Sequence, residues 1–344
     1  MKAILSIDIG SKNLHFAEGS YNKGGLVVQK AQTYPIPEGC MKDEFVENPT
    51  RLAETIRDCI KLGGFQAKEV ILTLNSCNAI VRDMDLPTAK PKDLDKMIRT
   101  ELKQTFNIIT TDVIQYKLIE KVNSESGLPL NRYRVIAIDS DIVESFHVLL
   151  KSAKLKAIAM DINLNAIEKL FTNVNMVNER LIGDETIMLM DFGDIYTTLY
   201  FCTKGRPVFY RHIKLGSREI EKSISDETYT PISEIQALKE SGYSFFSEEE
   251  AAKKYYALLK PFFYKFNDEI RKIMSFYSSR AGIPPVGYLY LFGQGSELEG
   301  LPAYFESNLN VPTEKIKSVS SINIGNAEQL LPANLNAIGA LIRY

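Results

Sequence analysis

The chain has 344 residues, of which 45% are hydrophobic and 24% charged, and its formal net charge is −2 at pH 7. This length is enough for two domains, each with its own core. The nearly balanced charge, with no block of Lys and Arg, argues against nucleic-acid binding as the main function. The four cysteines and three histidines are scattered, so we expect neither a structural metal site nor a disulfide framework.

No apolar run approaches the length of a membrane-spanning helix. Asp8 interrupts the apolar stretch at the N-terminus, which therefore does not resemble a signal peptide. We expect a cytoplasmic protein that reaches a membrane only through a partner.

Groups of strand-like segments are followed by helical segments, and this order predicts an α/β protein with mixed sheets. The predicted strands are residues 3–9, 26–34, 70–74, 79–86, 113–121, 133–138, 186–192, 196–202, 207–214 and 287–292. The predicted helices are residues 50–63, 92–106, 140–154, 163–173, 217–225, 231–241, 247–280, 301–309 and 333–342. Ser247 with Glu250 three residues later is typical of a capping box, and it predicts that the long helix starts there.

Residues 4–37 and 187–216 share one pattern. Each is an apolar strand ending in Asp-x-Gly, a polar turn, a second strand, a Lys-Gly turn and a third strand. Asp8 and Asp191 take equivalent places in the two copies. A repeat of this kind indicates two related domains, whose Asp-bearing hairpins could close on one ligand from opposite sides.

The residue types in the two turns suit a nucleoside triphosphate. Backbone amides of the turns would hold phosphates. The side chains that would add donors are Ser11 and Lys12 in the first turn and Thr197 and Thr198 in the second. Asp8 and Asp191 would hold Mg²⁺ through water, because this ion keeps much of its hydration shell. The alternative is that both turns are ordinary hairpin connections.

A third motif lies near residue 293, where a strand runs into Gly293-Gln294-Gly295-Ser296 before a helix that begins near Pro302. The two glycines would let a base or a ribose lie close against the backbone. Alone, the motif is an ordinary connection between a strand and a helix.

These motifs occur in the order that is characteristic of the actin-like ATPase superfamily, and the chain resembles the PilM family of type IV pilus assembly proteins, relatives of FtsA. The resemblance covers essentially the whole chain. It rests on the two Asp-x-Gly hairpins, Leu-Gly-Ser at 215–217, "EIQALKESG" at 234–242 and Gly-x-Gly-Ser at 293–296. Residues 68–120 are its most specific part.

The resemblance implies an actin-like (ribonuclease H-like) α/β fold of two domains around a nucleotide cleft, with a small inserted α+β subdomain. The implied limits are 1–79 for the N-terminal part of the first domain, 80–153 for the inserted subdomain, 154–183 and 320–344 for the return to the first domain, and 184–319 for the second domain.

The resemblance also implies ATP and Mg²⁺ as cofactors, with Asp8 and Asp191 at the metal and no residue assigned a catalytic role. The implied nucleotide-binding residues are Asp8, Gly10, Ser11, Lys12, Asn13, Asp191, Gly193, Thr197, Thr198, Gly216, Glu234, Lys239, Gly293, Gly295 and Ser296.

The partner that the resemblance implies is PilN, an inner-membrane protein. Its cytoplasmic N-terminal tail binds PilM proteins in a groove beside the inserted subdomain, which corresponds here to the region 80–110. Such a protein is recruited to the cytoplasmic face of the membrane and serves twitching motility. Further candidate partners are the pilus assembly or retraction ATPases and a second copy of the chain; no nucleic acid is expected.

Four departures from the family pattern bear on hydrolysis. His15 replaces a common Lys, Asn163 a common Glu, and Gln294 a middle glycine, while Asp194-Ile195 adds an acid and a bulky side chain. An amide can orient water but cannot accept its proton. We therefore expect nucleotide binding with weak or absent ATPase activity.

Two alternatives stay open. The first is an actively hydrolysing ATPase or a sugar-kinase-like phosphotransferase, for which Asp8, Asp161 and Asp191 are the only candidate bases. The second is an FtsA-like filament-forming protein.

Overall fold

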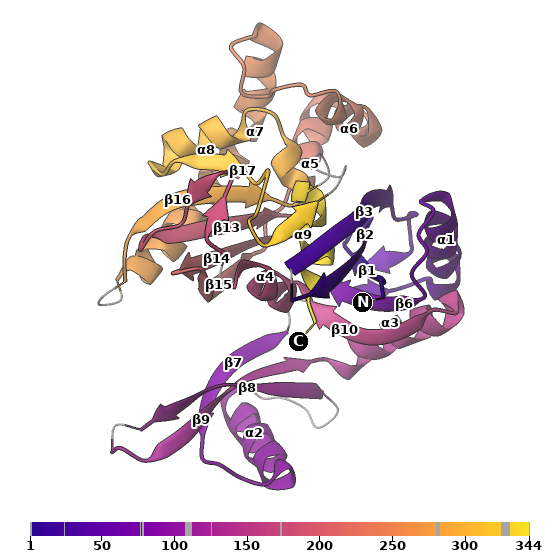
Figure 1. Ribbon diagram of the computed structural model, residues 1–344. Coiled ribbons are helices and arrows are strands. Elements are labelled where there is room, and N and C mark those ends of the chain that lie inside the picture. The colour runs from indigo at the N-terminus through magenta and orange to yellow at the C-terminus, as the bar shows by residue number, and fades with distance from the viewer. Residues whose placement is uncertain are drawn as a thin grey trace. The chain divides into compact units, whose positions relative to one another are not determined.

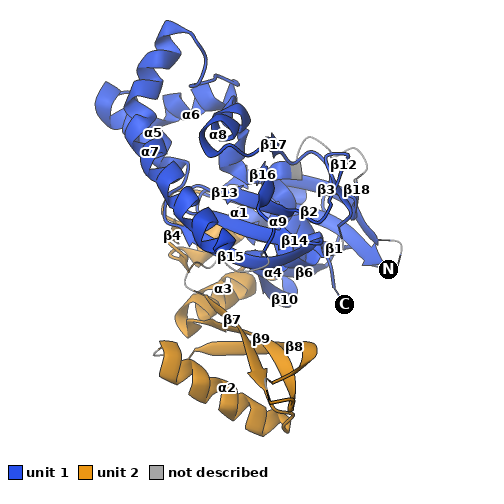
Figure 2. Cartoon of the chain, turned by 90° about the vertical axis from the view of Figure 1, so that its left-hand side faces the viewer, with its two compact units in different colours: residues 1–36, 55–75, 155–344 blue, residues 37–54, 76–154 orange. Residues whose placement is uncertain are grey.

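The computed structural model describes residues 2–23, 25–75, 77, 79–106, 112–124, 126–172, 174–279, 283–324 and 331–343. The chain forms two compact units (Figure 2). Unit 1 consists of residues 1–36, 55–75 and 155–344, and unit 2 of residues 37–54 and 76–154.

Unit 1 contains a six-stranded sheet with the order β10-β6-β1-β2-β3-β18 (Figure 1). Its strands are β1 (Ile4–Ile9), β2 (Asn13–Asn22), β3 (Gly25–Pro35), β6 (Glu69–Leu74), β10 (Lys156–Ile162) and β18 (Ile322–Ile324). β1, β2 and β3 form an antiparallel meander, whereas β6 runs parallel to both β1 and β10. Five of the six residues of β1 are buried, as is typical of a central strand covered on both faces.

Three helices accompany this sheet: α1 (Pro49–Leu62), which has residues in both units, α4 (Asn163–Phe171) and α9 (Leu331–Ala340). α9 contacts β1, β2, β3 and β6 of this sheet. It also contacts the strand β16 (Val286–Phe292) and the short helix η1 (Gln294–Glu297), which belong to the second sheet of unit 1 and its helices. It therefore connects the two sheets of unit 1.

The second sheet of unit 1 has the order β15-β14-β13-β16-β17. Its strands are β13 (Thr186–Phe192), β14 (Thr197–Thr203), β15 (Arg206–Ile213), β16 (Val286–Phe292) and β17 (Thr313–Lys315). Its helices are α5 (Arg218–Thr228), α6 (Ile232–Glu240), α7 (Glu250–Ser278), η1 (Gln294–Glu297) and α8 (Leu301–Leu309), and the short strands β11 (Met176–Val177) and β12 (Arg180–Leu181) pair beside it.

The two sheets repeat one arrangement, as the sequence pattern predicted. β1-β2-β3 and β13-β14-β15 are antiparallel meanders, and the first strand of each also pairs with a parallel strand, β6 or β16. Asp8 and Asp191 both stand one residue before the end of their strand. The predicted α/β class with mixed sheets is therefore confirmed.

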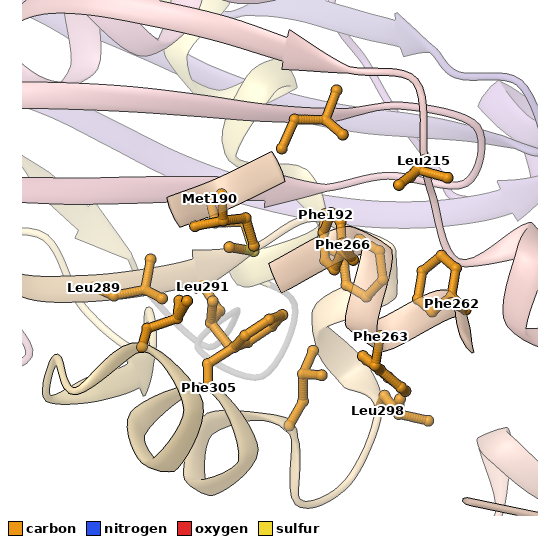
Figure 3. Close-up of a cluster of buried hydrophobic side chains, with 14 of the residues drawn as sticks. Met190, Phe192, Leu215, Phe262, Phe263, Phe266, Leu289, Leu291, Leu298 and Phe305 are labelled. Carbon is orange, nitrogen blue, oxygen red and sulfur yellow. The ribbon is translucent and has the colours of Figure 1, made fainter. Parts of the chain in front are cut away.

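A cluster of buried aromatic and aliphatic side chains fixes the end of β13 (Figure 3). Phe192 of β13 stacks on Phe266 of α7 with ring centroids 5.3 Å apart. Leu215, just before Gly216, belongs to the same cluster. Because the residues next to Asp191 and Gly216 are anchored in a close-packed core, the loops that carry them are held in place.

Unit 2 contains a three-stranded antiparallel sheet, β7-β9-β8, with β7 (Ile80–Leu86), β8 (Val113–Asn123) and β9 (Pro129–Ile138). Its other elements are α2 (Pro91–Phe106), α3 (Ser140–Ala153), β4 (Met41–Lys42) and β5 (Phe45–Val46). Met84 and Val135 of the sheet pack with Ile98 and Leu102 of α2 in a core of their own. Side chains alternate along a strand, so Asp83 and Asp85 lie on the other face; they pair there with Arg134 and Arg132.

The structure differs from the sequence expectation in several places. The strands that were not predicted are β10 and the short strands β4, β5, β11, β12, β17 and β18. The long helix begins at Glu250, with Glu249 as an N-cap that makes no side-chain cap hydrogen bond, so the capping box at Ser247 was wrong. Unit 2 includes residues 37–54, which were assigned to the first domain; the domain limits stay a prediction. None of the described helices is both long and apolar enough to span a membrane.

Candidate functional site

Asp8 lies at the carboxyl end of the parallel part of the first sheet. It is opposite Thr73 in β6, which is in turn opposite Asp161 in β10. Asp8 is only 4% exposed. In α/β sheets ligands bind outside the carboxyl ends of the parallel strands, so Asp8 has a position suited to a ligand contact.

Asp191 has the same position in the second sheet. It is opposite Phe292, the last residue of the parallel strand β16, and it is 8% exposed. The next residue, Gly293, has a φ of 82°, and a Cβ built on it would lie 2.3 Å from Oδ1 of Asp191. Only glycine fits there, because any side chain would meet the buried carboxylate.

Two asparagines connect the two carboxylates. Nδ2 of Asn336, in α9, donates to Oδ2 of Asp191 over 2.9 Å. Asn163 lies at the start of α4, and one orientation of its amide satisfies both ends. In this orientation Nδ2 donates to Oδ1 of Asp8 over 3.0 Å, and the oxygen accepts from Asn336 Nδ2 over 3.1 Å. A continuous chain of polar contacts thus runs from Asp8 through Asn163 and Asn336 to Asp191.

Burial and mutual repulsion disfavour two ionised carboxylates here. Burial, together with the charge of Asp191, raises the pKa of Asp8 to about 8, although Asn163 and Asn336 oppose the shift. Burial raises the pKa of Asp191 to about 6, again against the hydrogen bond from Asn336. A cation near the pair would favour both ionised forms.

The residues around the pair fit a hydrated Mg²⁺ ion. Thr73 Oγ1 and Asn336 Oδ1 are buried and have no hydrogen-bond partner among the residues that the structure describes, which is unusual for buried polar atoms. Water molecules in the shell of a cation could satisfy such oxygens. Among the residues described, no group of three or more His, Cys, Asp or Glu side chains is placed to hold a metal ion.

The first turn contacts the second half of unit 1 through three consecutive side chains. Ser11 Oγ donates to Asp194 Oδ2 over 2.9 Å. Lys12 Nζ lies 3.4 Å from Glu221 Oε1. Asn13 donates to the side-chain oxygen of Gln294. The structure therefore brings the first turn together with Asp194 of the second turn, Glu221 of α5 and Gln294 of η1.

Glu221 of α5, which was not among the predicted residues, is buried and contacts the predicted Lys12 and Lys239. It is 3% exposed and accepts hydrogen bonds from Lys239 (2.8 Å) and Gln236 (3.1 Å) of α6. Burial opposes its ionisation, but Lys239, Gln236 and Lys12 outweigh that effect and lower its pKa below the ordinary range. Glu234, which was predicted here, is exposed on α6.

Asp194 is held in the second turn by the segment that follows β15. Its buried carboxylate accepts from Arg218 as well as Ser11. The amides of Ser217 and Arg218 donate to the carbonyls of Gly193 and Asp194, both over 2.9 Å. A Cβ at Gly216 would lie 2.2 Å from the carbonyl oxygen of Asp194, so the close approach of these two segments requires glycine.

The other predicted residues of the second turn and of the motif at 293–296 contact neighbouring parts of the chain itself. Thr197 Oγ1 donates to the Leu215 carbonyl (2.7 Å), and Thr198 Oγ1 pairs with His212 Nδ1 (2.9 Å). A Cβ at Gly295 would lie 2.7 Å from the carbonyl of Phe192, and Ser296 Oγ donates to the Gly293 carbonyl (2.6 Å). These residues shape the loops, and their direct contact with a ligand stays a prediction.

His15, one of the departures from the family pattern, and Asp161, a candidate base, both have structural partners. His15 of β2 hydrogen bonds to Thr33 Oγ1 through Nδ1 (2.9 Å), and burial lowers its pKa to about 4, so it is neutral at pH 7. Asp161, a candidate base, accepts from Lys169 Nζ and Asn165 Nδ2, both at 2.6 Å. Its charge is therefore already compensated by Lys169.

Unit 1 has two matched sheets, each with an Asp near the end of its first strand, and a helix that connects both sheets. These features define the actin-like class of protein. The family model described as type IV pilus assembly protein PilM matches residues 6–340. The chain belongs to this PilM family.

Solved structures share this fold. A PilM-PilN type IV pilus biogenesis complex matches with a TM-score of 0.80 and 19% identity, over 98% of this chain and 97% of that one. The ethanolamine utilization protein EutJ from Carboxydothermus hydrogenoformans matches with a TM-score of 0.56 and 10% identity, over 98% and 90%. MreB5 of Spiroplasma citri, bound to AMPPNP, matches with a TM-score of 0.51 and 10% identity, over 98% and 95%.

Proposed function

We propose that this chain is a nucleotide-binding scaffold of type IV pilus assembly. It binds ATP with Mg²⁺ at the two Asp-bearing hairpins of unit 1 and docks the cytoplasmic N-terminal tail of PilN. Asp8 and Asp191 hold the ion through water, and the amides of the turns at 10–13 and 193–198 hold phosphates. The glycines at 293 and 295, with Ser296, Gly216, Glu234 and Lys239, belong to the nucleoside side.

The observation that carries the nucleotide site is the arrangement of Asp8 and Asp191. Both are buried and connected through Asn163 and Asn336. Two buried carboxylates that are joined by polar side chains suit a hydrated cation better than an unliganded protein interior. The Spiroplasma MreB5 structures with AMPPNP and ADP, which share the fold, support a nucleotide as the companion of that cation.

We infer that hydrolysis is weak or absent. A bound Mg²⁺ would neutralise phosphate charge, but attack by water also needs a proton acceptor. Asp161, Asp194 and Glu221 each accept from a Lys or Arg side chain. Next to Asp8 stands Asn163, whose amide cannot take a proton.

A steady-state phosphate-release assay with MgATP tests this inference. We expect turnover far below about 1 s⁻¹, the low end for ordinary enzymes. Phosphate release by Asp8→Asn gives the background rate without the proposed site. Asp184 is exposed, so Asp184→Asn is the control for the loss of one negative charge. Turnover near 1 s⁻¹ that Asp8→Asn abolishes would support an active ATPase instead.

The second part of the proposal places the PilN tail on unit 2, in the region 80–110, of which residues 107–110 lie outside the described residues. The fold that this chain shares with the PilM-PilN type IV pilus biogenesis complex supports PilN as the partner. β7 is an edge strand of the sheet in unit 2, and an extended peptide can add to such an edge through main-chain hydrogen bonds.

Hydrogen exchange of the full chain with and without a synthetic tail peptide of its PilN tests the docking. We expect slower exchange in residues 80–86, with and without MgATP. A scrambled peptide is the control. Protection elsewhere, or no binding by the folded protein, would contradict the proposal.

In this role the chain is cytoplasmic and reaches the inner membrane through PilN, and nucleotide shifts the population of partner-competent conformations. Self-association and contact with pilus assembly or retraction ATPases are further candidate interactions. Sedimentation with MgATP tests the FtsA-like alternative, because robust filaments without PilN would favour it.

A further inference from the structure

The donors of the first turn have anionic partners within the chain itself. Ser11 donates to Asp194, and the Lys12 ammonium pairs with Glu221. Both carboxylates are almost fully buried, with side-chain exposures of 7% for Asp194 and 4% for Glu221. A hydroxyl and an ammonium group of a phosphate-binding turn therefore contact carboxylates, which are chemically similar to phosphate oxygens.

Each carboxylate is also fixed from its own side. Arg218 holds Asp194, and Lys239 and Gln236 hold Glu221. A buried ionised carboxylate is retained only when cations and donors compensate it. These contacts hold the carboxylates of Asp194 and Glu221 in position to contact the first turn. Ser11 and Lys12 of that turn follow β1 of the first sheet, whereas both carboxylates belong to the second sheet and its helices.

We propose that Asp194 and Glu221 are internal anions that take the place of nucleotide phosphates at the first turn. Without a ligand they hold Ser11 and Lys12 and so keep the two halves of unit 1 together. A nucleotide must displace these contacts and also meets the negative charge that remains. The expected competition with the nucleotide rests on the proposed nucleotide binding. The role of the two carboxylates in holding Ser11 and Lys12 does not.

The role predicts two separate effects of neutralising either carboxylate. The first turn loses a partner, so residues 10–13 open more often in the free protein. The phosphates lose a competitor and a like charge, so MgATP binds more tightly. If the carboxylates only stabilised the local structure, MgATP affinity should change in the opposite direction. Their loss would then loosen the second turn and weaken MgATP binding.

The test compares wild type with Glu221→Gln, Asp194→Ala and the control Glu219→Gln. Glu221→Gln keeps the side-chain shape, so the test does not depend on Asp194→Ala folding. Glu219 is exposed on the same helix, so Glu219→Gln removes the same charge from the surface. Hydrogen exchange of residues 10–13 without nucleotide, and titration calorimetry with MgATP, are the two readouts.

We expect faster exchange at residues 10–13 in Glu221→Gln and Asp194→Ala, and MgATP affinity about tenfold tighter, equivalent to about 1.4 kcal/mol. Glu219→Gln should match wild type in both. Unchanged exchange in folded Glu221→Gln would overturn the inference, as would unchanged or weaker affinity in variants that bind MgATP. Faster exchange with no MgATP binding by any of the four proteins would support the internal-anion role and refute the proposed nucleotide site.

Discussion

The side-chain amide of Asn336 donates to the carboxylate of Asp191 over 2.9 Å and so joins the helix α9 to the end of β13. α9 packs on the strands of the first sheet, whereas Asp191 belongs to the second. One hydrogen bond to a buried charge therefore connects the two sheets at the point where the proposed cation binds.

Asn336→Ala should destabilise the free protein. It removes a donor from a buried carboxylate, and hydrogen bonds to charged groups contribute about 2 kcal/mol. Urea denaturation followed by circular dichroism measures the change. Asn123→Ala, at an exposed position of β8, should leave the midpoint within the error of wild type. Equal midpoints for all three proteins would show that the Asn336 contact contributes nothing.

Asp8→Asn should stabilise the free protein increasingly as pH rises. The pKa of Asp8 is about 8 in the folded chain and ordinarily 3.8. The folded state therefore keeps a proton that the unfolded state loses, and wild type loses this stability as pH rises from about 4 to about 8. The advantage of Asp8→Asn should grow by at most about 1.4 kcal/mol per pH unit.

Denaturation of Asp8→Asn, Asp184→Asn and wild type across that pH range measures the effect. Asp184 is 93% exposed, so Asp184→Asn should run parallel to wild type. A pH-independent difference between Asp8→Asn and wild type would contradict the raised pKa.

His15→Gln should make the free energy of unfolding depend less on pH in the acid range. The pKa of His15 is lowered to about 4 from 6.5 by burial, so between these values only the unfolded chain binds the proton. The stability from neutral His15 is present above about pH 6.5 and is lost as pH falls toward 4, with a slope of at most about 1.4 kcal/mol per pH unit.

The same denaturation series at acid pH measures this change. Exposed His147→Gln is the matched control and should retain the wild-type slope. If His15→Gln also retained that slope, the histidine would not be buried and neutral in the folded protein.

Gly216→Ala should open the packing of the second turn. The added methyl would lie 2.2 Å from the carbonyl oxygen of Asp194, and overpacking of this kind costs about 2 kcal/mol. Lower thermal stability and weaker MgATP binding should appear together. Gly183→Ala is the control, because its nearest neighbour would be the Glu185 side chain at 3.4 Å. Equal behaviour of the two variants would argue against a tight contact at Gly216.

The sequence predicted those parts of the fold that are marked by a pattern of neighbouring residues. The hairpins that begin at β1 and β13 are short, antiparallel and marked by Asp-x-Gly turns. The positions of Asp8 and Asp191 at the ends of the strands follow from that pattern alone.

The features that sequence missed depend on contacts between distant segments. Asn336 lies in an apolar helical pattern, where nothing local indicates a contact with Asp191 145 residues earlier. Glu221 belongs to a charged helical segment that is typical of a solvated surface, yet Lys12 and Lys239 surround it. β10 follows a helix directly and is recognisable as a strand only through its pairing with β6.

Titration calorimetry with MgATP, on wild type, Asp8→Asn, Asp191→Asn and the exposed control Asp184→Asn, tests the nucleotide-binding scaffold most directly. We predict micromolar binding by wild type and by Asp184→Asn, and affinity at least about tenfold weaker, a loss of about 1.4 kcal/mol or more, in the other two. Folded wild type that binds no MgATP, or Asp8→Asn and Asp191→Asn that bind it as wild type does, would contradict the account.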